Sequence, residues 1–403
     1  MSGTFTRLPA AIALFGAVLG LVFSTYSTVD YAAHLDRRLH DVHCSVIPGA
    51  PPQAEAEGCR AAMYSPYGAV LKDTFWGGLP VALPAQGSFA FFAGFALYLL
   101  LAGPRASKSA TVFFAAVAVT PLLVSLVMFV IAVTQLGTIC QTCVGIYTAS
   151  FLVAAGGVLG LLGLRPRSPM DVQRPRGNLL LPAVWLAVLG TLTLLPAAVY
   201  AASVPDERPY LASCGKLAKP AAKPGVLIHL AGPRAVKPAV IFEDPLCATC
   251  KGVHQRLASE GILDRLNVQL VLFPLDNECN WMLDQALHPG ACLVARAVLC
   301  SGEQAGQMLN WAYEEQEYLT RAGKAGEASL REVIRKRWGD NIARCLDDKQ
   351  TKLRLNEHLH FASNNSVPVS TPQIYLGNQR LCDEDTDMGL RYTLRQLAPE
   401  VLP

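Results

Sequence analysis

The chain has 403 residues, of which 52% are hydrophobic and only 16% are charged, and its formal net charge is +3. An ordinary soluble domain carries about 25% charged residues, so this composition indicates a large lipid-facing part and excludes intrinsic disorder. With 34 basic and 31 acidic residues, the charge is too evenly balanced for binding nucleic acid through bulk charge. A single core stops growing at about 250 to 300 residues, so we expect more than one domain.

Five apolar stretches in the first half of the chain approach or exceed the roughly 20 residues that a helix needs to cross a membrane. They run from about residue 9 to 28, 79 to 102, 110 to 136, 144 to 164 and 179 to 204. None carries a charged side chain in its middle. We predict five membrane spans, although the first stretch, which follows Arg7, also fits a secretory signal peptide.

Basic residues in the loops indicate how these spans are oriented. They collect between the second and third spans and between the fourth and fifth, and the positive-inside rule places both loops in the cytoplasm. These residues are Arg105, Lys108, Arg165, Arg167, Arg174 and Arg176. Residues 30–78 and everything after Val204 then lie outside, so each of the 12 cysteines belongs to an oxidising compartment or its edge.

A Cys-x-x-Cys pair, Cys140 and Cys143, stands where the fourth span begins. The start of a helix favours a thiolate, and two intervening residues let the sulfurs bond across one turn. Tyr147 lies one turn deeper on the same face, where its hydroxyl needs a partner such as a carbonyl oxygen of a buried ligand. We interpret the pair as redox-active, with a zinc half-site or a static disulfide as alternatives.

Two further cysteines, Cys44 and Cys59, lie at either end of a proline-rich part of the outer loop. They are either a structural staple for this loop or a shuttle disulfide. A shuttle would pass electrons between a soluble partner and the membrane pair.

The order of these motifs over residues 9–164 resembles the vitamin K epoxide reductase family. The two loop cysteines are followed by Ser65-Pro66-Tyr67-Gly68, then by Gly78-Leu79-Pro80-Val81-Ala82-Leu83 at the second span, then by the Cys-x-x-Cys. The resemblance implies a bacterial inner (cytoplasmic) membrane protein that uses a quinone, ubiquinone or menaquinone, as electron acceptor.

Residue roles also follow from this resemblance. It implies that Cys143 contacts the quinone, that Cys140 exchanges with Cys59, and that Cys44 meets the soluble thiol. It further implies that Tyr147 binds the quinone carbonyl and that Ser65 packs at the quinone pocket.

The second half of the chain alternates strand and helix patterns. Short apolar runs at 226–230, 239–242 and 268–273 predict strands, and Cys247-Ala248-Thr249-Cys250 follows the second of them before a helical stretch. This context is typical of a thioredoxin-like redox site, with Cys247 as the exposed thiolate and Cys250 as the resolving thiol. A zinc ribbon is the alternative, but it needs a second close cysteine pair.

Thr371 and Pro372 form a second mark of this fold. The stretch is similar to the Thr-Pro step of the Dsb family, which implies a cis-proline opposite Cys247. The cis bond would bring the backbone of Thr371 near Cys247, where it would pair with substrate backbone. The roughly 96 residues of mainly helical pattern between Phe273 and Ser370 resemble that subfamily's helical insertion.

The remaining cysteines are expected to be structural staples. Cys279, Cys292, Cys300 and Cys345 allow three pairings, which the sequence does not separate. Cys214 and Cys382 are left and could bridge the linker to the domain. His254 and His288 are expected to be ordinary surface or core histidines.

We therefore predict a membrane all-α helical bundle, with a four-helix core and a fifth linking span, followed by an α/β thioredoxin-like domain with a helical insertion. The expected boundaries are 1–204 for the membrane domain, 205–237 for the linker and start of the soluble domain, and 238–403 for the thioredoxin-like domain.

The predicted function is a quinone-dependent thiol oxidase that generates disulfides in secreted or periplasmic proteins with reduced cysteines, without a metal. Electrons would pass from substrate thiols through the thioredoxin-like pair, the loop cysteines and the membrane pair to the quinone pool. The alternatives are a membrane-anchored, non-enzymatic binding protein with structural disulfides only, and an exporter of thiol reductant.

Overall fold

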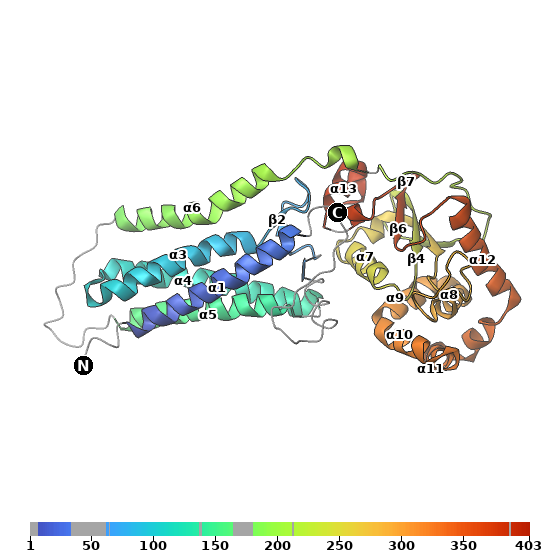
Figure 1. Ribbon diagram of the computed structural model, residues 1–403, viewed down its shortest axis with the longest axis horizontal. Coiled ribbons are helices and arrows are strands. Elements are labelled where there is room, and N and C mark those ends of the chain that lie inside the picture. Colours follow the sequence, from blue (N-terminus) through green and yellow to red (C-terminus); the bar gives the residue numbers. More distant parts are fainter. Residues whose placement is uncertain are drawn as a thin grey trace. The chain divides into compact units, whose positions relative to one another are not determined.

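The computed structural model describes residues 7–33, 62–63, 65–136, 139–163, 180–211, 213–386 and 388–403. The chain forms two compact units, Met1–Pro205 and Asp206–Pro403. Long helices dominate the first unit, whereas the second combines a sheet with shorter helices (Figure 1).

Within the described residues, five helices of the first unit are long and apolar enough to cross a membrane. In chain order they are α1 (Leu8–Ala33), α3 (Ala82–Ala102), α4 (Lys108–Ile131), α5 (Gln141–Leu162) and α6 (Leu180–Ser203). Many of their leucine, valine and phenylalanine side chains are exposed, as a surface facing lipid requires. The predicted spans are confirmed, and the chain is a multi-pass membrane protein.

Four of these helices form the core of the bundle. α1 packs against α3 and α5, α4 packs against α5, and α6 packs mainly along α3. The contact between α3 and α6 is close because Gly87 has no side chain: a Cβ there would lie 2.0 Å from the backbone oxygen of Leu192. The structure thus has the predicted four-helix core with a fifth, peripheral span.

A short antiparallel hairpin shapes one end of the bundle. β1 (Ala69–Val70) pairs with β2 (Leu79–Pro80), directly before α3. The hydroxyl of Tyr31, near the end of α1, donates a hydrogen bond to the backbone oxygen of Gly77. These contacts hold the segment 65–80 against α1.

The second unit is built on a five-stranded sheet with the order β3-β5-β4-β6-β7. The strands are β3 (Ile228–Ala231), β4 (Lys237–Glu243), β5 (Leu266–Leu272), β6 (Gln373–Leu376) and β7 (Gln379–Arg380). β4 and β5 are parallel and are joined by α7 (Ala248–Ser259), whereas the other neighbours are antiparallel. β4 and β5 are mostly buried because apolar clusters pack on both faces of the sheet.

A group of helices separates β5 from β6. It comprises α8 (Ala291–Cys300), α9 (Ala305–Glu314), α10 (Gln316–Ala325), α11 (Glu327–Cys345) and α12 (Lys349–Asn364). α13 (Leu390–Leu397) follows the last strand. The unit is therefore the predicted thioredoxin-like domain with a helical insertion.

Three disulfides cross-link this unit. They join Cys214 to Cys382, Cys279 to Cys292, and Cys300 to Cys345. The structure thus selects one of the pairings that the sequence left open, and the expected bridge from the linker to the domain is present. The segment 205–237 also contributes β3 and pairs Lys216 with Gln379, so much of it is part of the second unit.

Candidate active sites

The membrane cysteine pair lies at the start of α5. Cys140 directly precedes the helix in an extended conformation and is buried, whereas Cys143 lies in the first turn and is partly buried. The two thiols lie within hydrogen-bonding reach of each other. The structure therefore brings the two sulfurs together at a helix N-terminus, as the spacing predicts.

A cavity of about 100 Å³ adjoins this pair. Its walls are the C-terminal ends of α1 and α4, the segment around residues 62–68, the start of α3 and the first turns of α5. Most of the lining is apolar, and Ser65, Tyr147 and both cysteines contribute to it. Asp30, which the sequence analysis did not single out, also lines the cavity.

The two predicted quinone-contacting side chains have defined settings. The ring of Tyr147 packs edge-on against Phe129, with ring centroids 6.0 Å apart. The hydroxyl of Ser65 donates to the backbone oxygen of Ala62 at 2.8 Å, and the Nζ of Lys72 donates to the backbone oxygen of Ser65. Ser65 therefore fixes the shape of the loop that walls the cavity.

The loop cysteines Cys44 and Cys59 lie outside the described residues. Their pairing and their exchange with Cys140 stay predictions.

The second Cys-x-x-Cys pair stands at the start of α7, after a short turn that follows β4. Cys247 precedes the helix, is 6% exposed, and lies 3.5 Å through its Sγ from the backbone oxygen of Thr371. Cys250 is fully buried, and its Sγ accepts a hydrogen bond from the amide of Asp244 at 3.5 Å. The peptide bond between Thr371 and Pro372 is cis, as the resemblance implied.

The two thiols of this pair have opposite acidities. A hydrogen bond from the Cys250 thiol outweighs the opposing effect of burial and lowers the pKa of Cys247 to about 6. Burial, reinforced by the neighbouring Cys247, raises the pKa of Cys250 well above its usual range. These acidities favour Cys247 as the attacking thiolate and Cys250 as the resolving thiol. The prediction that Cys247 is exposed is wrong, because only 6% of the residue is accessible.

Buried polar groups stand behind Cys250. The carboxylate of Glu243, the last residue of β4, lies 3.4 Å from Nδ1 of His254 on α7. Burial by itself would lower the pKa of His254, but the attraction of Glu243 raises it overall. The ring of Tyr313 packs on His254 and its buried hydroxyl has no hydrogen-bond partner within the described part. His254 is thus a partly buried histidine whose partner is the carboxylate of Glu243.

A second carboxylate organises the turn that carries Cys247. The side chain of Asp244 is fully buried and accepts hydrogen bonds from the amides of Leu246 at 2.7 Å and Leu275 at 2.8 Å. Nδ1 of His288 lies 2.7 Å from the same carboxylate. The sequence analysis missed this pair because 44 residues separate its members.

The helical insertion also holds the active turn directly. Gln316, at the start of α10, donates from Nε2 to the backbone oxygens of Pro245 at 3.2 Å and Cys247 at 3.0 Å. Asp244 and Gln316 together therefore fix the backbone on both sides of Leu246.

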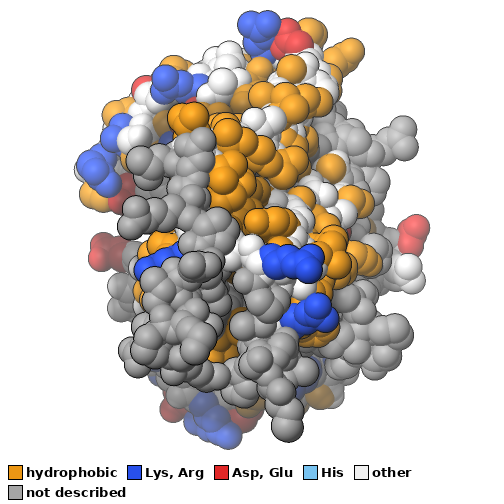
Figure 2. Space-filling model, turned by 90° about the vertical axis from the view of Figure 1, so that its left-hand side faces the viewer, with side chains coloured by type: hydrophobic (Ala, Val, Ile, Leu, Met, Phe, Trp, Pro, Cys, Tyr) orange, Lys and Arg blue, Asp and Glu red, His pale blue; other side chains and the backbone are white. Residues whose placement is uncertain are grey.

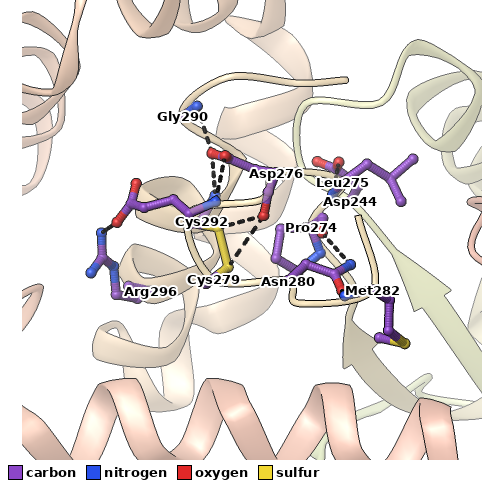
Figure 3. Close-up of a disulfide and its surroundings, with 11 residues drawn as sticks. Asp244, Pro274, Leu275, Asp276, Cys279, Asn280, Met282, Gly290, Cys292 and Arg296 are labelled. Carbon is purple, nitrogen blue, oxygen red and sulfur yellow. Dashed lines mark hydrogen bonds and ion pairs between the residues drawn. A yellow bond between two sulfur atoms is a disulfide. The ribbon is translucent and has the colours of Figure 1, made fainter. Parts of the chain in front are cut away.

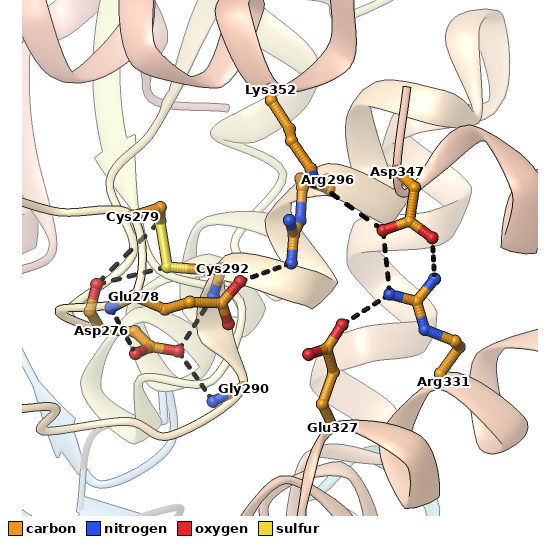
Figure 4. Close-up of polar contacts among 10 residues, drawn as sticks. All are labelled: Asp276, Glu278, Cys279, Gly290, Cys292, Arg296, Glu327, Arg331, Asp347 and Lys352. Carbon is orange, nitrogen blue, oxygen red and sulfur yellow. Dashed lines mark hydrogen bonds and ion pairs between the residues drawn. A yellow bond between two sulfur atoms is a disulfide. The ribbon is translucent and has the colours of Figure 1, made fainter. Parts of the chain in front are cut away.

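Two acidic side chains near this turn are engaged in contacts within the protein. Asp276, Glu278 and Cys292 could together hold a metal ion by position, but the sulfur of Cys292 is bonded to Cys279. Asp276 accepts a hydrogen bond from the amide of Gly290 at 2.8 Å, and Glu278 pairs with Arg296 at 2.8 Å (Figure 4). These side chains therefore act as a structural hub.

Comparison with known proteins agrees with the membrane motifs. Residues 11–156 match the model of the vitamin K epoxide reductase family. This stretch is similar to the vitamin K epoxide reductase family. It contains the cavity, both membrane cysteines and Tyr147. No curated protein matches the chain.

Solved oxidoreductases are similar to this chain in structure. The oxidoreductase NmDsbA1 from N. meningitidis is 14% identical, with a TM-score of 0.31, over 46% of this chain and 90% of its own. Oxidoreductase DsbA from Xylella fastidiosa is 18% identical, with a TM-score of 0.32, over 43% of this chain and 94% of its own. The thioredoxin-like assignment itself rests on the sheet order and on the cysteine pair facing a cis-proline.

Proposed function

We propose that this vitamin K epoxide reductase domain and its thioredoxin-like partner form a quinone-dependent thiol oxidase that makes protein disulfides de novo. The chain is a thiol–disulfide oxidoreductase by its family domain and its fold. The observation that carries the finer proposal is the apolar cavity that both Cys143 and Tyr147 line.

The first step takes place at the thioredoxin-like pair. A substrate thiolate attacks the Cys247–Cys250 disulfide, and a second substrate thiol resolves the mixed disulfide. The substrate leaves with a disulfide, and Cys247 and Cys250 are reduced. The backbone of Thr371, beside the cis Pro372, lies next to Cys247 and can pair with the substrate backbone.

The next steps carry two electrons to the membrane pair. The reduced Cys247–Cys250 pair exchanges with the loop disulfide, Cys44 with Cys59, which in turn reduces Cys140–Cys143. The close approach of Cys140 and Cys143 at the start of α5 suits such an exchange.

The last step transfers two electrons and two protons from the membrane dithiol to a quinone, and the Cys140–Cys143 disulfide forms again. The apolar walls fit an aromatic ring, and Tyr147 offers a hydroxyl to the carbonyl that gains negative charge. Ubiquinone and menaquinone both suit this lining.

We propose the bacterial inner membrane as the location, with the thioredoxin-like unit on the periplasmic side. Arg105 lies between α3 and α4 and Lys108 is the first residue of α4, so both belong to one end of the bundle, and Cys140 follows α4 at the other end. On the face seen in Figure 2, Lys and Arg side chains lie beside a broad apolar area, and a few acidic side chains lie toward its outline. The positive-inside rule assigns such an end to the cytoplasm and the cavity to the outer side.

The test is quinone-dependent oxidation of a reduced dithiol peptide by the purified full-length protein. Wild type should consume one quinone per peptide disulfide formed. Cys143→Ser should abolish quinone reduction but still allow one round of exchange at Cys247, and Cys247→Ser should abolish peptide oxidation. A protein whose two Cys-x-x-Cys pairs both resist mild reductant and alkylation is a binding protein, and this result would refute the proposal.

A further inference from the structure

The dipeptide between Cys247 and Cys250 supplies no charge to the active site. It consists of Ala248 and Thr249, neither of which can stabilise a thiolate as a cation. Directly upstream, the buried Asp244 carboxylate brings a negative charge, which opposes ionisation of Cys247. A site that works through a thiolate therefore needs a positive charge from elsewhere in the fold.

His288 is the side chain that the fold brings to this carboxylate. Its Nδ1 lies 2.7 Å from Asp244, and its ring remains partly exposed, at 26%. We propose that His288 is a positioning residue whose positive charge neutralises Asp244, so that Asp244 holds the active turn without disfavouring the Cys247 thiolate. This inference rests on the proposed thiol exchange at Cys247.

The loop that carries His288 is anchored on both sides of the histidine. The amides of Leu287 and His288 donate to the backbone oxygen of Leu275 at 2.9 and 3.0 Å. Two residues further on, the amide of Gly290 donates to Asp276. Gly290 has a φ of 93°, a conformation that favours glycine, and it directly precedes α8.

A disulfide closes this loop. Cys279 and Cys292, 13 residues apart, are bonded, and both sulfurs lie against the backbone oxygen of Asp276 (Figure 3). The arrangement ties the His288 loop to the end of β5 through covalent and hydrogen bonds. A ring so held can present a fixed charge, as an electrostatic partner of a buried carboxylate must.

The other charged groups nearby leave this role to His288. Besides Asp244, the negative groups that act on His288 are Cys247 and Asp276, and all favour its protonated form. Burial alone would lower the pKa of His288, but the contact with Asp244 raises it overall. His254 faces Glu243 instead, so its charge is already matched.

The experiment measures how fast Cys247 is alkylated as a function of pH. It uses the full-length protein in detergent with Cys250→Ser in every sample, and peptide mass spectrometry reads Cys247 alone. His288→Gln should raise the pH of half-maximal reactivity by about 0.5 to 1 pH unit, because Asp244 then acts unopposed. The control His229→Gln, an exposed histidine on β3, should leave the midpoint unchanged.

Two further variants separate charge from structure. His288→Lys keeps a positive charge and should show little of the shift seen in His288→Gln, whereas a purely structural role predicts a full shift in both variants. Asp244→Asn combined with His288→Gln removes both charges and should return the midpoint to the reference value or below. This double variant also keeps an amide pair in place if His288→Gln folds poorly.

The outcomes distinguish this inference from the proposed function. An unchanged midpoint in His288→Gln, or a double variant as shifted as the single one, would overturn the role of His288. A reference protein in which Cys247 does not react below pH 9 would instead remove the proposed exchange at Cys247.

Discussion

The acidity of Cys247 predicts how the reduction potential of the thioredoxin-like pair depends on pH. The pKa of Cys247 is about 6, and that of Cys250 lies well above its usual range. Reduction of the disulfide therefore takes up two protons below pH 6 but only one proton above it. Each proton per two electrons contributes about 30 mV per pH unit, so the slope should change from about −59 to about −30 mV per pH unit near pH 6.

The same shift stabilises the reduced protein. A lowered thiol pKa stabilises this form above pH 9, the ordinary value for the thiol, and the stabilisation is lost as the pH falls through about 6. At pH 7 it is still worth about 1.4 kcal/mol, which raises the potential by about 30 mV over that of an ordinary pair. Cys247–Cys250 should thus be more oxidising than a disulfide between two cysteines of ordinary pKa.

The assay equilibrates full-length protein in glutathione buffers of known potential between pH 5 and 9. Acid quenching, alkylation with a mass tag and peptide quantification then give the reduced fraction of Cys247–Cys250. A Cys140→Ser, Cys143→Ser variant serves as control, because electrons cannot drain to the membrane pair. A single slope of about −59 mV per pH unit from pH 5 to 8 would refute the assigned acidity of Cys247.

Three further predictions follow from other parts of the structure. Tyr147→Phe should slow quinone reduction roughly tenfold or more without affecting peptide exchange. The control Tyr200→Phe on α6, outside the cavity lining, should leave both rates unchanged in steady-state assays. Gly87→Leu should lower the melting temperature in detergent by several degrees, since its Cβ would meet the α6 backbone, whereas Gly94→Leu on the same helix meets nothing within 4 Å and should not. Burial lowers the pKa of His358 to about 4, so denaturant titrations should show the second unit losing up to about 3 kcal/mol as the pH falls from 6.5 to 4, and His358→Leu should flatten this dependence.

Local patterns were enough to predict much of this molecule. The length of the apolar stretches predicts the spans, because a helix must satisfy its own hydrogen bonds in lipid. The Cys247 pair was found because its strand, turn and helix are consecutive in the chain. The cis bond at Pro372 followed only from the resemblance, since proline alone is rarely cis.

Contacts between distant segments could not be predicted in this way. His288 meets Asp244 and Gln316 meets the active turn only after the insertion has folded back on the sheet. Cysteine pairing is likewise a property of the fold, because three arrangements of Cys279, Cys292, Cys300 and Cys345 share one sequence. The position of Asp30 in the cavity lining was not predicted for the same reason, because the cavity is formed by the ends of several helices that are distant in the sequence.

The three disulfides of the second unit impose an order on its biogenesis. The bridge from Cys214 to Cys382 spans 168 residues, so it can close only after the chain has been made as far as Cys382. Cys279 and Cys292, only 13 residues apart, can join much earlier. The bridge that closes the His288 loop can therefore form before the one that spans the unit.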